Sequence, residues 1–261
     1  MFEPSLLSIL HNRVVCCNTG KDGPNMPFND ITKILRSWQY EPSTLNVRTL
    51  EAGDGRELIQ LRIELGVIQM ELDGRPDGVL QDGYESLLAL LEERGTHGGL
   101  DPEICRRLRE EGVQRSHRAA ALFALSRWDD VIRDCNDNLA LFDVCRENAL
   151  EEIDRDALEQ FRGSVIALST RAAAERAIED DDPSGAMSAI DAGLEELKIA
   201  LGEMWEQSNE TQLLLGMKEA MIPQLPPSQR ADIKDRLSDA IAAENFELAA
   251  ILRDELRMLQ E

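Results

Sequence analysis

The feature that most constrains this fold is a helical period of apolar residues that runs from about residue 101 almost to the end of the chain. Ile104 and Leu108 begin it, and Leu122, Val131 and Leu139 continue it. Apolar side chains three or four positions apart share one face of an α-helix. Apolar residues make up 43% of the chain and aromatic residues only 4%, a balance that suits Ala/Leu-rich helices. We therefore predict a mainly α protein, with a helical array over residues 101–222.

A different period occupies residues 45–72. Val47 and Thr49 alternate with polar residues, and the same alternation returns at Ile59 and Leu61 and again over residues 67–72. Alternation of this kind predicts β-strands. Turn-forming stretches at 53–55 and 73–78 separate and close the three strands. We expect a three-stranded meander.

The meander needs cover on one of its faces. Two amphipathic segments, 30–39 and 84–91, are the candidates for that cover. We predict a small α+β unit over residues 29–98, preceded by a weakly ordered N-terminus over residues 1–28. In the loop at 73–78, turn chemistry explains the Asp and Gly residues better than a Ca²⁺ site, because the closing Glu of an EF-hand is missing.

Charge excludes several classes of function. Fifty acidic and 28 basic side chains give a net charge of -22, which repels a polyanion and argues against tight direct binding of nucleic acid. No apolar run approaches the roughly 20 residues of a membrane helix, and the first residues lack the basic start of a signal peptide. We expect a cytoplasmic protein that binds neither nucleic acid nor membrane directly.

Cysteine and histidine give little basis for a metal or redox site. The chain has five cysteines, at positions 16, 17, 105, 135 and 145, without the spacing of a disulfide framework, and three histidines. The adjacent Cys16 and Cys17 are either an incidental pair or a redox or soft-metal site. Cys135 and Cys145 fall in a helical apolar pattern, where cysteine serves as a small buried hydrophobe. No structural metal or other cofactor is expected.

Within the helical array, two segments repeat one pattern. At 111–143 and at 166–199, a helix rich in small residues is followed by a short polar break and a second amphipathic helix. Trp128 lies nine positions after Ala119, and Pro183 lies nine positions after Ala174. This pattern resembles a divergent tetratricopeptide repeat, in which stacked helix pairs form a concave surface for a peptide or a partner helix. The alternative is that the stripes are core and the acidic faces are solvated.

The last segment, residues 228–261, carries two further helical stripes. Apolar residues at 233, 237, 240 and 241 form the first stripe, and those at 246, 249, 250, 256 and 259 form the second. Glu244 and Asn245 separate them, so an antiparallel helical hairpin is predicted. We expect Phe246, which follows the reversal, to cover both helices as part of the core. So small a hairpin packs against its own domain, a second copy or another protein.

The hairpin sequence resembles the UvrB/UvrC (UVR) motif. Its matching residues are Leu237, Ala240, Asn245-Phe246-Glu247, Ala249-Ala250, Leu252-Arg253-Asp254 and Leu256. In that family the motif is a hairpin through which nucleotide-excision proteins associate, and it also occurs in Clp-linked stress regulators, so the resemblance implies partner binding. A looser likeness joins residues 46–78 to uncharacterised bacterial UVR-motif proteins. No helicase or nuclease motif of the repair enzymes is present.

Catalytic motifs are missing too. The sequence has no phosphate-binding G-x-x-x-x-G-K-[ST] loop, no G-x-G-x-x-G and no G-x-S-x-G elbow. We therefore expect a non-catalytic protein that docks a partner, or a second copy of itself, in stress or proteolysis regulation. The alternative is an accessory factor of nucleotide excision repair. The candidate partner-binding residues are Leu237, Phe246, Glu247, Ala250, Arg253, Asp254 and Leu256.

Overall fold

The computed structural model describes residues 31–221, 233, 236–241 and 245–258. It divides the chain into two units, Met1–Gln39 and Tyr40–Glu261. The first unit contains the short helix α1 (Thr32–Ser37), which confirms a helix within the segment predicted at 30–39. The predicted weakly ordered N-terminus lies outside the described residues. The second unit contains every other described element.

The predicted meander is confirmed. Strands β1 (Asn46–Glu51), β2 (Glu57–Ile63) and β3 (Gly66–Glu71) form one antiparallel sheet in the order β1-β2-β3. The register sets Val47 opposite Leu61 and Ile59 opposite Met70. Gly55, in the first predicted turn, has a φ of 85°, which glycine adopts without a steric penalty.

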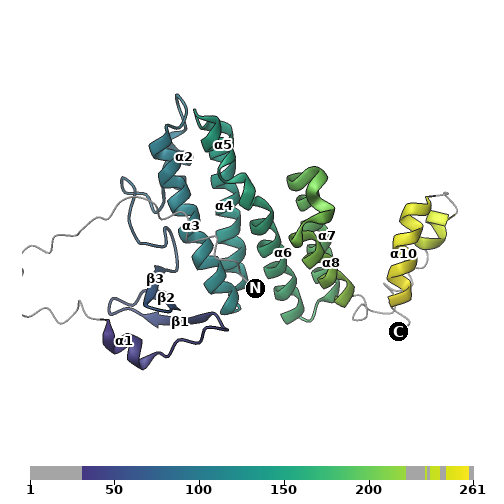
Figure 1. The fold of residues 1–261 in the computed structure, drawn as a ribbon, viewed down its shortest axis with the longest axis horizontal. Coiled ribbons are helices and arrows are strands. Elements are labelled where there is room, and N and C mark those ends of the chain that lie inside the picture. Colours follow the sequence, from purple (N-terminus) through teal and green to yellow (C-terminus); the bar gives the residue numbers. More distant parts are fainter. Residues whose placement is uncertain (1–30, 222–232, 234–235, 242–244, 259–261) are drawn as a thin grey trace, which may run out of the picture. The chain divides into compact units, whose positions relative to one another are not determined.

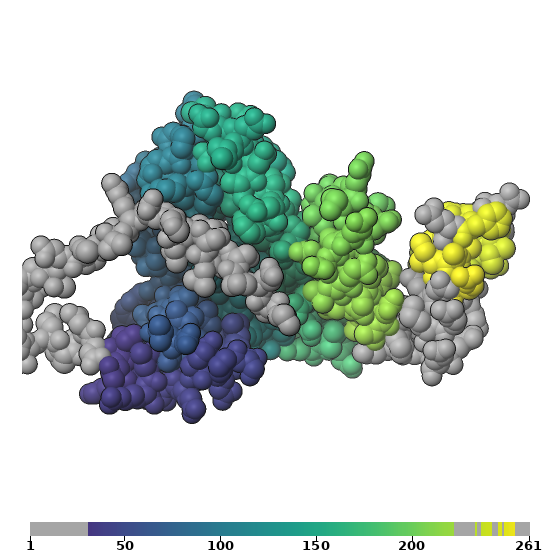
Figure 2. Space-filling model, viewed as in Figure 1, coloured from purple at the N-terminus to yellow at the C-terminus, as the bar shows by residue number. Residues whose placement is uncertain are grey.

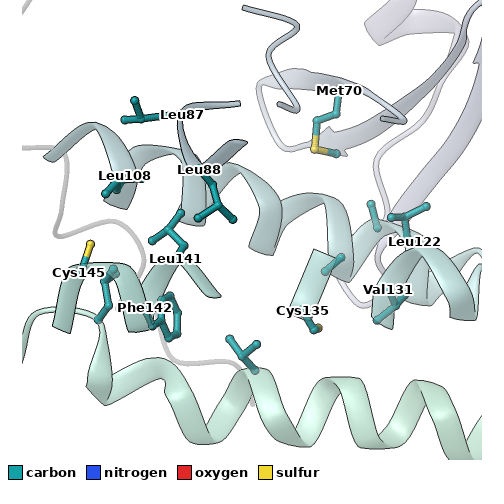
Figure 3. Packing of buried hydrophobic residues seen from close by; sticks show 14 of the residues in the cluster. Met70, Leu87, Leu88, Leu108, Leu122, Val131, Cys135, Leu141, Phe142 and Cys145 are labelled. Carbon is teal, nitrogen blue, oxygen red and sulfur yellow. The ribbon is translucent and has the colours of Figure 1, made fainter. Parts of the chain in front are cut away.

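One face of this sheet enters the main hydrophobic core. Ile59, Leu61 and Met70 are buried, and they share a cluster with residues of α2, α3 and α4. Figure 3 shows Met70 on the sheet side of this cluster and Leu87, Leu108 and Leu141 on the helical side. The sheet is therefore built onto the start of the helical array.

Helix α2 (Leu87–Arg94) begins later than the predicted segment 84–91. The hydroxyl of Ser86 caps it by accepting the amide hydrogen bond of Ala89 at 3.0 Å. Tyr84 does not belong to the helix, because it pairs with Gln81 in an isolated β-bridge. Asp82, between them, has a φ of 50° and turns the chain, so the prediction of a helix from residue 84 is wrong at its start.

The predicted helical array is confirmed. It consists of α3 (Pro102–Ala124), α4 (Trp128–Asn148), α5 (Glu152–Asp156), α6 (Arg162–Glu179), α7 (Pro183–Leu201) and α8 (Asn209–Met221). Short 3₁₀ segments, Glu159–Phe161 and Gly202–Gln207, precede α6 and α8. Consecutive long helices pack against one another, as Figure 1 shows. Asp101 and Asp182 cap α3 and α7, each followed by a proline at the first helical position.

The turns of the two helix pairs have the same backbone geometry. Between α3 and α4, Arg127 N–H donates to the Leu122 carbonyl at 3.0 Å, and between α6 and α7, Asp182 N–H donates to the Ala177 carbonyl at 2.8 Å. Ser126 and Asp181, which lie 55 positions apart, have φ values of 55° and 56°. Both turns are Schellman-type helix ends, in which one left-handed residue lets the chain leave the helix.

The pattern of buried residues also repeats after 55 positions. Ala119, Val131, Cys135 and Phe142 are buried in the first pair, and the positions 55 residues later, Ala174, Ala186, Ile190 and Leu197, are buried in the second. Figure 2 shows the two pairs in teal and green, side by side. The chain therefore contains a twofold internal repeat of a helix pair. Its likeness to a tetratricopeptide repeat stays a prediction.

Cys105, Cys135 and Cys145 are all buried in the helical core. Burial raises the pKa of the Cys135 and Cys145 thiols to about 12, so both are protonated at neutral pH. The prediction that Cys135 and Cys145 serve as small buried hydrophobes is confirmed. Cys16 and Cys17 lie outside the described residues.

Among the helices that the structure describes, none combines the length and the apolar character needed to cross a membrane. The described residues also include no group of three or more His, Cys, Asp or Glu placed to hold a metal ion.

Candidate partner-binding surfaces

The C-terminal segment reverses direction at Asn245, close to where the sequence predicts it. Helical backbone is described at 233 and 236–241, and helix α10 spans Phe246–Met258. The Asn245 N–H donates to the Ala240 carbonyl at 2.9 Å. Its side-chain Oδ1 accepts the amide hydrogen bond of Leu248 at 3.2 Å. Asn245 thus closes the end of the first helix and caps the second.

The two helices of this C-terminal hairpin share a small core. Ile233 and Ala240 on the first helix and Ala249 and Leu252 on the second are buried together, and Leu237 packs against them. Leu237, a candidate partner-binding residue, therefore contributes to the hairpin's own packing. Two of the four buried side chains are alanines, so the apolar area that this core removes from water is small.

The prediction that Phe246 is core is wrong. Its exposed fraction is 70%, whereas that of Leu252 is 2%. Phe246 lies six positions before Leu252, which at 3.6 residues per turn places it roughly 120° away around the helix. The helices meet along the face that carries Ala249 and Leu252, so the aromatic ring lies on the flank of α10 and faces solvent.

Other apolar side chains of the hairpin are exposed as well. Ile241 on the first helix is 55% exposed, and Leu248 and Ile251 on α10 are 37% and 53% exposed. With Phe246 they give the hairpin apolar surface on both of its helices. An apolar residue that remains in solvent gains nothing from folding, and such residues mark surfaces that a partner covers when they occur together.

The remaining candidate residues of the hairpin are less completely described. Arg253 is exposed and Ala250 is half-buried. The side chains of Glu247, Asp254 and Leu256 lie outside the described residues. The structure therefore places Phe246 and Arg253 on the surface of the hairpin and Leu237 against its core.

A second arrangement of polar residues lies where the sheet meets α3 and α4, at the segment that joins β3 to α2. We call residues 72–86 the β3–α2 loop. Arg118 of α3 donates to the Glu71 carbonyl at 2.9 Å, and Arg133 of α4 donates to the Leu72 carbonyl at 2.9 Å. Both helices therefore hold the chain where β3 ends and the loop begins.

Helix α3 also holds the loop farther along. Gln114 donates to the Asp77 carboxylate at 2.9 Å, and Arg107 donates to the side-chain carbonyl of Gln81. At the end of the loop, the buried Glu111 carboxylate accepts the amide hydrogen bond of Leu87 at 2.8 Å. Side chains of α3 thus bond Asp77 and Gln81 within the loop and the residues that flank it, Glu71 and Leu87.

The centre of this arrangement is a fully buried ion pair. Arg118 Nε and Nη2 donate to the two carboxylate oxygens of Asp134 at 2.7 and 2.8 Å, and neither side chain is exposed. Sequence reasoning missed this pair, because it treated charged residues on the helices as solvated faces. A signal was available: Arg115 and Arg118 fall between Leu108 and Leu122 on the apolar stripe of α3.

Comparison with known proteins matches the last part of the chain. The sequence profile of the UvrB/uvrC motif matches residues 229–261, which include the described part of the C-terminal hairpin. No curated protein and no solved structure matches the chain. The match covers the end of the chain and does not extend to the sheet, the helical array or the β3–α2 loop. The C-terminal hairpin of this chain therefore matches the UvrB/uvrC motif.

Proposed function

We propose that this chain is a non-catalytic protein that docks a partner protein through the C-terminal hairpin. The observation that carries the proposal is the exposure of Phe246, Ile241 and Ile251 within a matched UvrB/uvrC motif. The motif is a unit of association in the proteins that define it. Exposed apolar side chains form the kind of surface that such an association buries.

The size of the hairpin supports the same proposal. Units of this length rarely hold enough apolar area to fold alone, and the described core contains four buried side chains, two of them alanine. Covering Phe246 with a partner would bury one large aromatic ring, and aromatic anchors dominate the energetics of interfaces. Partner binding would thus contribute the burial that the hairpin core lacks.

The helical array is proposed as an acidic scaffold for this docking unit. The net charge of -22 disfavours polyanionic partners. Association with a UvrB-like or UvrC-like protein would make the chain an accessory of nucleotide excision repair, as the name of the matched motif suggests. Association with a Clp chaperone or a protein kinase would place it in stress or proteolysis regulation, which is our first proposal.

Variants of the hairpin test the docking function. Phe246→Ala should weaken partner capture by about tenfold or more, since loss of an aromatic hot spot costs 2 kcal/mol or more. Helix content and melting of the full chain should stay nearly unchanged, because the ring is 70% exposed. Arg253→Glu should weaken capture in the same way. Quantitative pull-down and circular dichroism measure the two properties separately.

Two control variants show whether a loss of capture comes from the binding surface or from unfolding of the hairpin. Ile199→Ala removes an apolar side chain that is 82% exposed on α7, and capture should be unchanged. Leu252→Ala empties the hairpin core and should reduce both helix content and capture. Mass spectrometry of the captured proteins then separates excision nucleases from Clp chaperones and kinases. Unchanged capture by Phe246→Ala would contradict docking through the hairpin.

A further inference from the structure

The β3–α2 loop presents apolar side chains on a rigid backbone. Val79 and Leu80 are 53% and 63% exposed. Around them, Asp77 Oδ1 accepts the amide hydrogen bond of Val79 at 3.0 Å, and Gln81 Nε2 donates to the Val79 carbonyl at 3.2 Å. A segment that is already ordered loses little conformational entropy on binding, so exposed apolar residues held in this way favour association.

A pocket of about 340 Å³ lies beside these residues. Leu72 and Leu80 form its apolar lining. Arg56, in the turn between β1 and β2, and Glu71, the last residue of β3, also line it and form an ion pair. Leu80 thus belongs both to the exposed tip of the loop and to the wall of the pocket. A volume of this size accommodates one long side chain rather than a folded element.

The charge of the pocket favours a cationic group. Its lining includes four carboxylates, from Glu57, Glu71, Asp73 and Glu85, and two guanidinium groups, from Arg56 and Arg75. Both guanidinium groups are engaged, Arg56 with Asp54 and Glu71 and Arg75 with Asp77. Glu57 and Asp73 pair with Arg127 and Arg133 from outside the pocket. Among the described residues Glu85 is therefore the lining carboxylate that forms no ion pair, and it is exposed. Lysine and arginine combine an apolar stem with a cationic head, which matches a pocket that has leucine walls and the exposed carboxylate of Glu85.

The two helix pairs of the internal repeat differ in the charged residues that they bury. Glu111, Arg115, Arg118 and Asp134 of the first helix pair correspond, 55 positions later, to Ile166, Thr170, Ala173 and Ala189 of the second. The second pair packs without buried ions at these positions. A buried ion pair contributes little or negative net stability compared with apolar packing. Two of these side chains, Glu111 and Arg118, bond the backbone of Leu87 and Glu71 on either side of the loop, and Arg115 and Asp134 pair with them. Holding the ends of the loop therefore accounts for burying charges in the first pair.

We infer that the β3–α2 loop and its pocket form a second docking surface, for a basic peptide segment of a partner protein. An apolar residue of the peptide packs on Val79 and Leu80, and a neighbouring lysine or arginine enters the pocket toward Glu85. This surface works independently of the C-terminal hairpin, because the residues that line its pocket lie between Arg56 and Glu85.

A displayed library of random peptides, selected on the full-length chain, tests the inference. The selected peptides should combine apolar residues with lysine or arginine. Synthetic copies are then measured by fluorescence anisotropy against variants of the chain. Leu80→Ser and Glu85→Lys should each weaken binding by about tenfold or more. Both side chains are exposed, so far-UV circular dichroism should be unchanged.

Matched controls come from the β2–β3 turn, outside the pocket. Leu65 is 84% exposed, and Glu64 beside it is exposed too. Leu65→Ser and Glu64→Lys make the same chemical changes as the test variants and should leave peptide affinity within about twofold, a difference of roughly 0.4 kcal/mol. Phe246→Ala in the hairpin should have no effect on peptide affinity, which separates this inference from the proposed function.

Several outcomes would overturn the inference. If the library yields acidic peptides, or no peptides at all, the proposed ligand is not a basic peptide segment. If Leu80→Ser and Leu65→Ser reduce the affinity equally, the peptides do not bind specifically at the pocket. Loss of affinity with Phe246→Ala would assign the peptides to the hairpin instead.

Discussion

At the scale of single residues, the Arg118–Asp134 pair gives the sharpest prediction. Asp134→Leu leaves the guanidinium of Arg118 in a site where its exposed fraction is 0%. Removing one member of a buried pair costs about 3 to 5 kcal/mol, because the other charge stays buried without compensation. We expect a loss of that size in the free energy of unfolding, measured by urea denaturation.

The double variant Arg118→Met/Asp134→Leu is the matched control. It removes both charges and should be more stable than Asp134→Leu alone, since apolar residues of similar volume replace such pairs at little cost. It also removes the hydrogen bond to the Glu71 carbonyl, so amides of the β3–α2 loop should exchange faster with solvent. A double variant as unstable as the single one would show that the pair is not the source of the effect.

At the scale of elements, the crossing of α6 and α7 depends on Gly193. A Cβ atom built at this position would lie 2.0 Å from Thr170 Oγ1. Gly193→Ala therefore forces the two helices apart. Overpacking costs about 1 to 3 kcal/mol. Three Thr170 side-chain atoms crowd the added Cβ, so we expect a cost in the upper part of this range, above the roughly 1 kcal/mol that alanine gains over glycine in a helix. Thermal unfolding should show a lower melting temperature.

Gly216 in α8 supplies the opposite case. A Cβ atom at this position meets nothing within 4 Å, so Gly216→Ala keeps the helix-propensity gain of up to about 1 kcal/mol and should raise the melting temperature. If both alanine variants shift the melting temperature in the same direction, close approach of α6 and α7 is not what distinguishes them.

Element types were predictable where the period was clear. Alternation identified β1, β2 and β3, and the prolines at 102 and 183 lie at the starts of α3 and α7. The start of α2 and the burial of Phe246 were predicted wrongly. A local pattern shows which side chains share a face of a helix, but the neighbouring helix determines which part of that face is covered.

At the scale of the whole molecule, the prediction concerns duplex DNA. The net charge of -22 opposes the release of counterions that drives DNA binding. We expect the isolated chain to show no sub-micromolar dissociation constant for duplex DNA at about 150 mM salt. Fluorescence anisotropy with a labelled duplex measures this, with a basic DNA-binding protein as the positive control. Tight binding at that salt concentration would contradict the argument from net charge.

The sequence by itself determined the fold class, the meander, the twofold helix pair and the UvrB/uvrC motif, because periods of two and of three to four residues are local properties of a chain. Only the tertiary structure decided that Arg118 and Asp134 are buried, that Phe246 faces solvent and that the β3–α2 loop lies beside a pocket. These features depend on contacts between segments distant in sequence, such as the 47 positions that separate Arg118 from Glu71. The burial of a charge is set by the segment that covers it, and no local pattern records which segment that is.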